Sequence, residues 1–286
     1  MYPSFLFLLI AFLLNDARAD SPAKRERVDC GAVKEFITLH SYLRKDPEDR
    51  AKESDALETA QKAAKGCSGA AHRMIRVSKT LGIAGVNRKN RMEIGMEFAL
   101  RDTATTEAFI GVFRMASAED VLDLDLDSAL RLARSLSIEF KGDPTRALQD
   151  FERVLKWCSD ATRSGLTRKD CGEFSARIAR EGEGWRESVS KAWIGLFEFL
   201  TQTSSGPGLT SGEARDLARD LAASGPAAMK SFSAAYEYAL DTEGLSLTRD
   251  QSIELAKSLV SMSGTDGIKN ELQRILPEKS KVRSDR

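Results

Sequence analysis

The sequence contains little of the material from which most catalytic and metal-binding sites are built. Only two of the 286 residues are histidines, and no C-x-x-C pair, P-loop, G-x-G-x-x-G or H-E-x-x-H motif occurs. Redox, nucleotide-dependent and zinc-dependent enzymes therefore have no support from sequence motifs, and we expect no cofactor. The 43 Lys and Arg residues balance 43 Asp and Glu. A net charge of zero argues against a general nucleic-acid-binding protein, whose surface must displace counterions from phosphates.

Long apolar runs are also missing, except at the start of the chain. Residues 5–14 read FLFLLIAFLL, and Ala17-Arg18-Ala19 follows. These features are typical of the h-region and A-x-A cleavage site of a secretory signal peptide, although the first four residues carry no Lys or Arg. The alternative is a membrane anchor, but ten helical residues extend only about 15 Å, half of a bilayer core. We therefore expect export to a periplasm or out of the cell, without a membrane span or a lipid anchor.

Export changes the interpretation of the cysteines. The four cysteines are Cys30, Cys67, Cys158 and Cys171. An even number in an oxidising compartment favours two disulfides. A turn expected at residues 46–49 lies midway between the first two cysteines, and a turn at residues 163–166 lies midway between the last two. In a pair of antiparallel helices, residues equidistant from the connecting turn lie at the same height along the helix axes. We therefore expect the disulfides Cys30–Cys67 and Cys158–Cys171. Four buried free thiols are the alternative if the chain is not exported.

Five segments of the chain share one pattern. Each has a residue that can cap a helix, with an apolar residue before it and apolar, small and apolar residues seven, eight and eleven positions after it. The five capping residues are Asn87, Asp125, Thr167, Thr210 and Thr248. Their side-chain oxygens can accept hydrogen bonds from the free amides of a first helical turn. The apolar positions share one helix face, so each segment predicts an amphipathic helix, called helix A.

A second pattern follows the first four capping residues, with three large residues separated by three and then one position. The four occurrences are Phe109-Phe113-Met115, Phe151-Leu155-Trp157, Trp193-Phe197-Phe199 and Phe232-Tyr236-Tyr238. They are offset by 42, 42 and 39 positions, which indicates a repeat. The fifth unit has Arg274 at the third position, as a polar terminal cap would require. Each unit therefore reads as helix A, a loop and a second helix, called helix B.

These patterns predict an all-α protein, an α-solenoid of about five helical hairpins with a period of about 38–43 residues behind an N-terminal helical cap. The period resembles that of HEAT and armadillo-type α-solenoids. A lone hairpin cannot bury its apolar faces, so the units are expected to stack. The expected organisation is a signal peptide over residues 1–19, the helical cap over 20–80, the repeat array over 81–276 and a polar tail over 277–286.

The third large residue of helix B is a candidate for binding. It lies about 200° around the helix from the second and cannot share its face. The candidates are Met115, Trp157, Phe199 and Tyr238. They either pack between neighbouring units or line a groove that binds a partner. Packing is expected for Trp157, which adjoins a cysteine, whereas the hydroxyl of Tyr238 needs a hydrogen-bond partner or water.

Two acidic segments invite a chemical interpretation. Residues 123–127 alternate Asp and Leu, but the Gly and Glu of a calcium-binding EF-hand loop are replaced by Ser128 and Arg134, so a capped helix start is expected. The loop after residue 180 carries Glu181 and Glu183 beside Trp185. Paired carboxylates can cleave glycosidic bonds, although the same composition describes a solvated turn.

The sequence thus predicts an exported, non-enzymatic helical-repeat scaffold that binds another protein or peptide, with no metal and no nucleic acid. One alternative is an exported glycan-acting hydrolase that uses Glu181 or Glu183, which requires two carboxylates within about 5–10 Å. Another is a carrier of an apolar ligand, which requires a closed apolar cavity of several hundred Å³.

Overall fold

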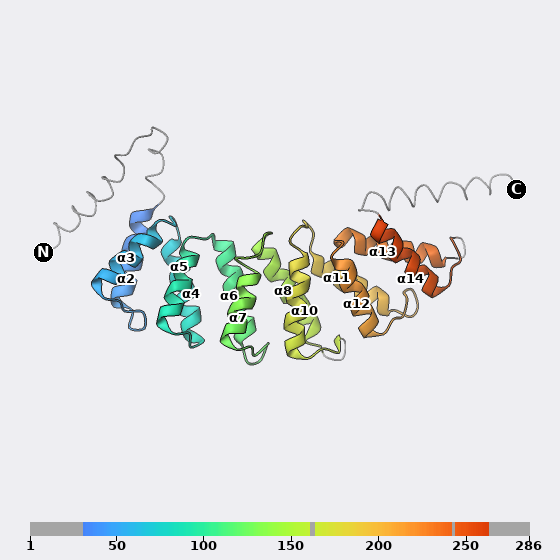
Figure 1. Ribbon diagram of the computed structural model, residues 1–286, viewed down its shortest axis with the longest axis horizontal. Coiled ribbons are helices and arrows are strands. Elements are labelled where there is room, and N and C mark those ends of the chain that lie inside the picture. The colour runs from blue at the N-terminus through green and yellow to red at the C-terminus, as the bar shows by residue number, and fades with distance from the viewer. Residues whose placement is uncertain (1–30, 161–163, 242–243, 263–286) are drawn as a thin grey trace, which may run out of the picture. The chain divides into compact units, whose positions relative to one another are not determined.

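The computed structural model describes residues 31–160, 164–241 and 244–262, and in these ranges every regular element is a helix (Figure 1). The prediction of an all-α protein is confirmed. The expected signal peptide, the expected polar tail and Cys30 lie outside the described residues. No described helix is both long and apolar enough to cross a membrane. The chain divides into two compact units between Thr103 and Ala104, and each unit is considered separately.

The first unit contains four helices whose contacts are made largely by small side chains. They are α2 (Ala32–Lys45), α3 (Glu53–Ala64), α4 (Ala70–Ile83) and α5 (Arg88–Ala99). Helix α2 contributes Leu39 and Leu43 to the core, and α3 contributes Ala56 and Ala60. These pairs lie four positions apart, so each forms one buried stripe. Because alanine is small, the backbone of α3 can approach its neighbours closely.

The second unit contains the remaining helices, which follow one another in chain order (Figure 1). They are α6 (Thr103–Ser117), α7 (Leu126–Ser135), α8 (Pro144–Cys158), α10 (Arg168–Glu181), α11 (Val189–Thr201), α12 (Ser211–Ala222), α13 (Pro226–Leu240) and α14 (Arg249–Met262). The first two large residues of every helix-B pattern are buried in this unit. The pattern therefore marks the core-facing side of α6, α8, α11 and α13.

The predicted starts of helix A are confirmed at all five positions. The side chains of Asn87, Asp125, Thr167 and Thr210 each accept a hydrogen bond from the amide three residues later. The amide of Gln251 lies 3.4 Å from the hydroxyl of Thr248 in the same way. At Thr210 the contact is reciprocal, because the Glu213 carboxylate accepts from the Thr210 amide. The small residue eight positions after each cap is buried, as close helix packing requires.

Two residues before each cap, the backbone adopts the left-handed conformation. The residues and their φ angles are Gly85 (82°), Asp123 (52°), Gly165 (65°), Gly208 (60°) and Ser246 (53°). Glycine occupies three of these positions because it alone enters this region without steric cost. The sequence patterns had not revealed this feature. Its fivefold recurrence shows that the connection into each helix A is built in the same way.

The apolar residue between the left-handed residue and the cap is also held in a recurring way. The amides of Leu124, Leu209 and Leu247 donate to the carbonyls of Ala116, Leu200 and Ala239, at distances between 2.8 and 2.9 Å. These three acceptors occupy the same position, seven residues after the first large residue of helix B. At the connection before Thr167 the hydroxyl of Ser164 bridges the gap, because it donates to the Cys158 carbonyl and accepts from the Leu166 amide.

Candidate functional site

Trp157 is part of the interior. Its side chain is 6% exposed, and its ring meets Trp193 and Phe197 edge to face at centroid distances of 4.7 Å. This burial removes Trp157 as a groove-lining residue, and packing between α8 and α11 explains why the position is aromatic. The other three candidates, Met115, Phe199 and Tyr238, are half-buried. Because Trp157 interrupts the row, the four residues do not form a continuous exposed surface.

The disulfide Cys158–Cys171 is present, as the spacing about the turn predicts. It joins the end of α8 to the first turn of α10, with a Cα–Cα distance of 5.7 Å. In the repeat, Cys158 occupies the position of Ala116, Leu200 and Ala239. The disulfide therefore stands at a position where the other helix-B segments have an apolar residue. Cys30 lies outside the described residues, so the pairing of Cys30 with Cys67 stays a prediction.

We expect the variant Cys158→Ala/Cys171→Ala to be less stable by about 2–4 kcal/mol, because the cross-link restricts the unfolded chain. Thermal unfolding followed by far-UV circular dichroism measures the loss. On addition of a reductant, the melting temperature of the wild type should fall further than that of the variant, in which only the predicted Cys30–Cys67 bond remains to be reduced. An unchanged wild-type melting temperature in the reductant would contradict the expected contribution.

The acidic loop between α10 and α11 makes contacts with neighbouring helix pairs. The Glu183 carboxylate accepts from the Lys141 amide at 3.2 Å, and Glu187 pairs with Lys230 at 2.7 Å. The ring of Trp185 lies against Gly225, where a Cβ atom would come within 2.5 Å of it. These contacts give the loop a role in joining successive units, and only Glu181 faces the groove described below.

The acidic segment before α7 forms a helix start. The Asp125 carboxylate accepts from both the hydroxyl and the amide of Ser128, and the first of these bonds lowers the pKa of Asp125. Among the described residues, no group of three or more His, Cys, Asp or Glu side chains is placed to hold a metal ion. The geometry at this segment is that of a helix cap.

A groove lies between α7 and α10, the A helices of two successive units. Its volume is about 740 Å³. Its apolar lining comes from Leu124, Leu132, Gly172 and Ala176. The Leu124 amide is fixed to the carbonyl of Ala116, so the repeated connection positions one edge of the groove. Because Gly172 has no side chain, the methyl groups of Leu122 can approach α10 closely. They lie about 3 Å from the point that a Cβ atom of residue 172 would occupy.

The charged lining of this groove is predominantly basic. It consists of Arg131, Lys169, Arg177, Arg180, Glu173 and Glu181. Arg131 donates to the Ser128 hydroxyl at 2.9 Å, and Arg180 donates to the Ser135 hydroxyl at 2.8 Å. Both of these partners are neutral. Lys169 and Arg177 have no hydrogen-bond or ion-pair partner among the described residues. Arg131 also interacts electrostatically with the nearby Asp125 carboxylate, whereas Lys169, Arg177 and Arg180 keep their charge available for a ligand.

Sequence reasoning missed this groove, although one signal was present. The apolar residues seven positions after each cap, including Leu132, are half-buried, whereas those eleven positions after the cap are mostly buried. Phe174 packs edge to face against Trp193, whereas Leu132 lines the groove, so the sequence position alone does not tell the two cases apart. The basic residues of α7 and α10 are about 40 positions apart in sequence, so their convergence depends on how the helices pack.

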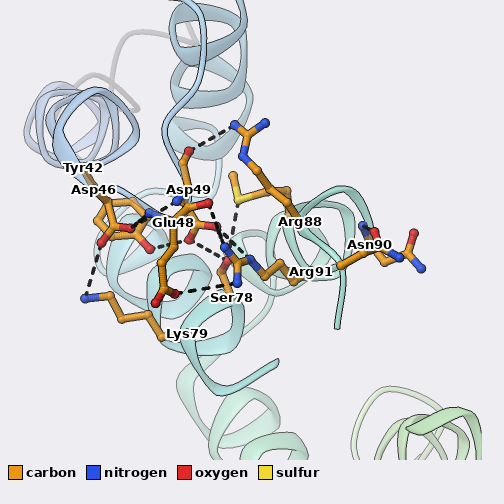
Figure 2. A network of polar contacts seen from close by, with 11 residues as sticks. Tyr42, Asp46, Glu48, Asp49, Ser78, Lys79, Arg88, Asn90 and Arg91 are labelled. Atoms are coloured by element: carbon orange, nitrogen blue, oxygen red, sulfur yellow. Dashed lines mark hydrogen bonds and ion pairs between the residues drawn. The ribbon is translucent and has the colours of Figure 1, made fainter. Parts of the chain in front are cut away.

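A second polar cluster lies in the first unit, where it joins helices (Figure 2). The Asp49 carboxylate is 1% exposed and accepts from Nε and Nη2 of Arg91 at 2.8 and 2.6 Å. Its other oxygen accepts from the hydroxyls of Tyr42 and Ser78. Burial and the hydrogen bond to Asp49 raise the pKa of Tyr42, so this hydroxyl stays a donor. Because both carboxylate oxygens are satisfied, the cluster ties the α2–α3 turn to α4 and α5.

Comparison of the chain with protein-family models, with curated proteins and with solved structures finds no match. Its function is therefore inferred from the geometry of the chain alone.

Proposed function

We propose that the chain is an exported, non-enzymatic helical-repeat scaffold, an α-solenoid of about five hairpins behind an N-terminal helical cap, that binds another protein or peptide. The groove between α7 and α10 carries this proposal, because it combines an apolar lining with Lys169, Arg177 and Arg180, which have no charged partner among the described residues. Such a combination is suited to a polypeptide, which offers both apolar and charged groups along one segment.

The repeated connections support the solenoid part of the proposal. Five helices begin with the same left-handed residue, apolar residue and cap, and stacked repeats have this regularity because each unit packs mainly on its neighbours. The disulfide between α8 and α10 supports export, because disulfides persist in oxidising compartments.

Placing a charge among the apolar lining residues should abolish binding. Leu132→Asp introduces a carboxylate among the apolar lining residues, and its matched control is Leu217→Asp, at the equivalent half-buried position of α12 outside the groove. The mature wild-type chain and both variants serve as baits in affinity capture from the native compartment. We expect the same captured protein with the wild type and Leu217→Asp, and its loss with Leu132→Asp. A protein retained equally by all three baits would contradict the assignment of the groove.

A further inference from the structure

We infer that the segment bound in the α7–α10 groove is acidic and carries apolar side chains between its carboxylates. This inference rests on the proposed function and specifies the chemistry of the partner. Four cations and two carboxylates line the groove, whereas the whole chain has no net charge. The local excess of positive charge is therefore a property of this groove and not of the protein as a whole.

The cations come from both helices that form the groove. Arg131 is supplied by α7, whereas Arg177 and Arg180 are supplied by α10. A segment lying between the two helices would meet a guanidinium group on either side. The planar guanidinium presents parallel N–H donors that match the two oxygens of a carboxylate. The hydrogen bonds of Arg131 and Arg180 to their serine partners each use one Nη2 atom, which leaves further donors for a ligand.

The apolar lining distinguishes an acidic peptide from other anions. Leu124 and Leu132 are half-buried in the groove, so a ligand must cover apolar surface as well as neutralise charge. A polypeptide can do both by alternating carboxylates with Leu, Ile or Phe. A nucleic acid places its charges on a continuous phosphate backbone and gains most of its affinity there, which leaves the leucines without apolar partners. The two lining carboxylates also repel such a uniform polyanion.

Selection from a random peptide library tests this inference because it assumes nothing about the sequence of the natural partner. Dodecapeptides displayed on phage are selected on the mature chain with its disulfides intact. We expect enrichment of Asp and Glu next to large apolar residues. The most enriched peptide, synthesised with a fluorescein label, should bind more weakly as salt is raised from about 50 to about 300 mM, because ions screen exposed charges.

Charge reversal locates the binding. Arg177→Glu/Arg180→Glu should weaken binding of the labelled peptide by about tenfold or more, since two attractions become repulsions. The matched control is Arg186→Glu/Lys191→Glu, which makes the same change of charge at exposed positions outside the groove and should leave the affinity unchanged.

The outcomes separate the partner chemistry from the proposed function. Enriched peptides that are neutral or basic, but lose binding in Leu132→Asp, would overturn the acidic partner and leave the peptide-binding groove intact. Equal affinity for a labelled oligothymidylate of the same charge would also overturn the acidic peptide. Absence of any enrichment, or enriched peptides that bind Leu132→Asp as well as the wild type, would count against the proposed function itself.

Discussion

Trp157→Ala should lower the free energy of unfolding by about 3–5 kcal/mol, as loss of a buried aromatic side chain does. The substitution removes both edge-to-face contacts, with Trp193 and with Phe197. The adjacent disulfide fixes the end of α8, which limits how far the neighbours can move into the cavity. The indole Nε1 makes no hydrogen bond with the described residues, so the loss is one of apolar contact. Urea unfolding followed by far-UV circular dichroism measures it.

Tyr238→Ala is the matched control for this prediction. Tyr238 holds the same repeat position in α13 but is half-buried, so its truncation exposes less new apolar surface and should cost less. Trp157→Phe should recover a large part of the stability because an aromatic ring still fills the site. Equal losses for Trp157→Ala and Tyr238→Ala would show that burial does not distinguish the two positions.

Asp49→Ala should destabilise the first unit by about 3–5 kcal/mol, because it leaves a buried charge without its partner. The Arg91 side chain is 9% exposed, so water cannot replace the lost carboxylate. The hydroxyls of Tyr42 and Ser78 lose the same acceptor. Amide hydrogen exchange of peptides from α4 and α5 measures the effect in this unit alone, and faster exchange is expected there.

Glu48→Ala provides the control in the same turn. The Glu48 carboxylate lies 3.8 Å from Nη1 of Arg91 and is 71% exposed, so its removal should cost less than about 1 kcal/mol. The contrast tests whether burial of the carboxylate determines the contribution of each partner of Arg91. Similar exchange rates in the Asp49 and Glu48 variants would show that it does not.

The features predicted from the sequence are those determined by neighbouring residues. Caps such as Thr210 were identified because a side-chain oxygen and the amide that it accepts from lie three positions apart. The left-handed residues were missed because Asp123 and Ser246 stand where the other units have glycine, which hides the recurrence. The turn that contains Asp49 was expected, but its bond with Arg91 joins residues 42 positions apart, and no local pattern indicates such a pairing.

At the candidate site too, features determined by neighbouring residues were predicted, and features determined by packing between helices were not. The repeat pattern placed Leu132 on an amphipathic helix, yet the groove exists because α7 and α10 present their basic side chains toward a shared space. The sequence suggested aromatic residues as binding candidates, and one of them is buried because it packs across two helices of successive units. A residue's position on its own helix is a local property, whereas its exposure depends on which helix packs beside it.

The repeated connection before each helix A has a consequence for where the chain tolerates a change of length. The first large residue of each helix B precedes the next cap by 16, 16, 17 and 16 positions, which is nearly constant. Each cap precedes the first large residue of the following helix B by 22, 26, 26 and 22 positions, which varies more. The variation in length among the units therefore lies on the side of the loops from A to B. A tag or fluorophore placed in such a loop away from the contacts of Glu183 and Trp185 should leave the spacing of the helices intact, whereas one placed in a B-to-A connection should disrupt it.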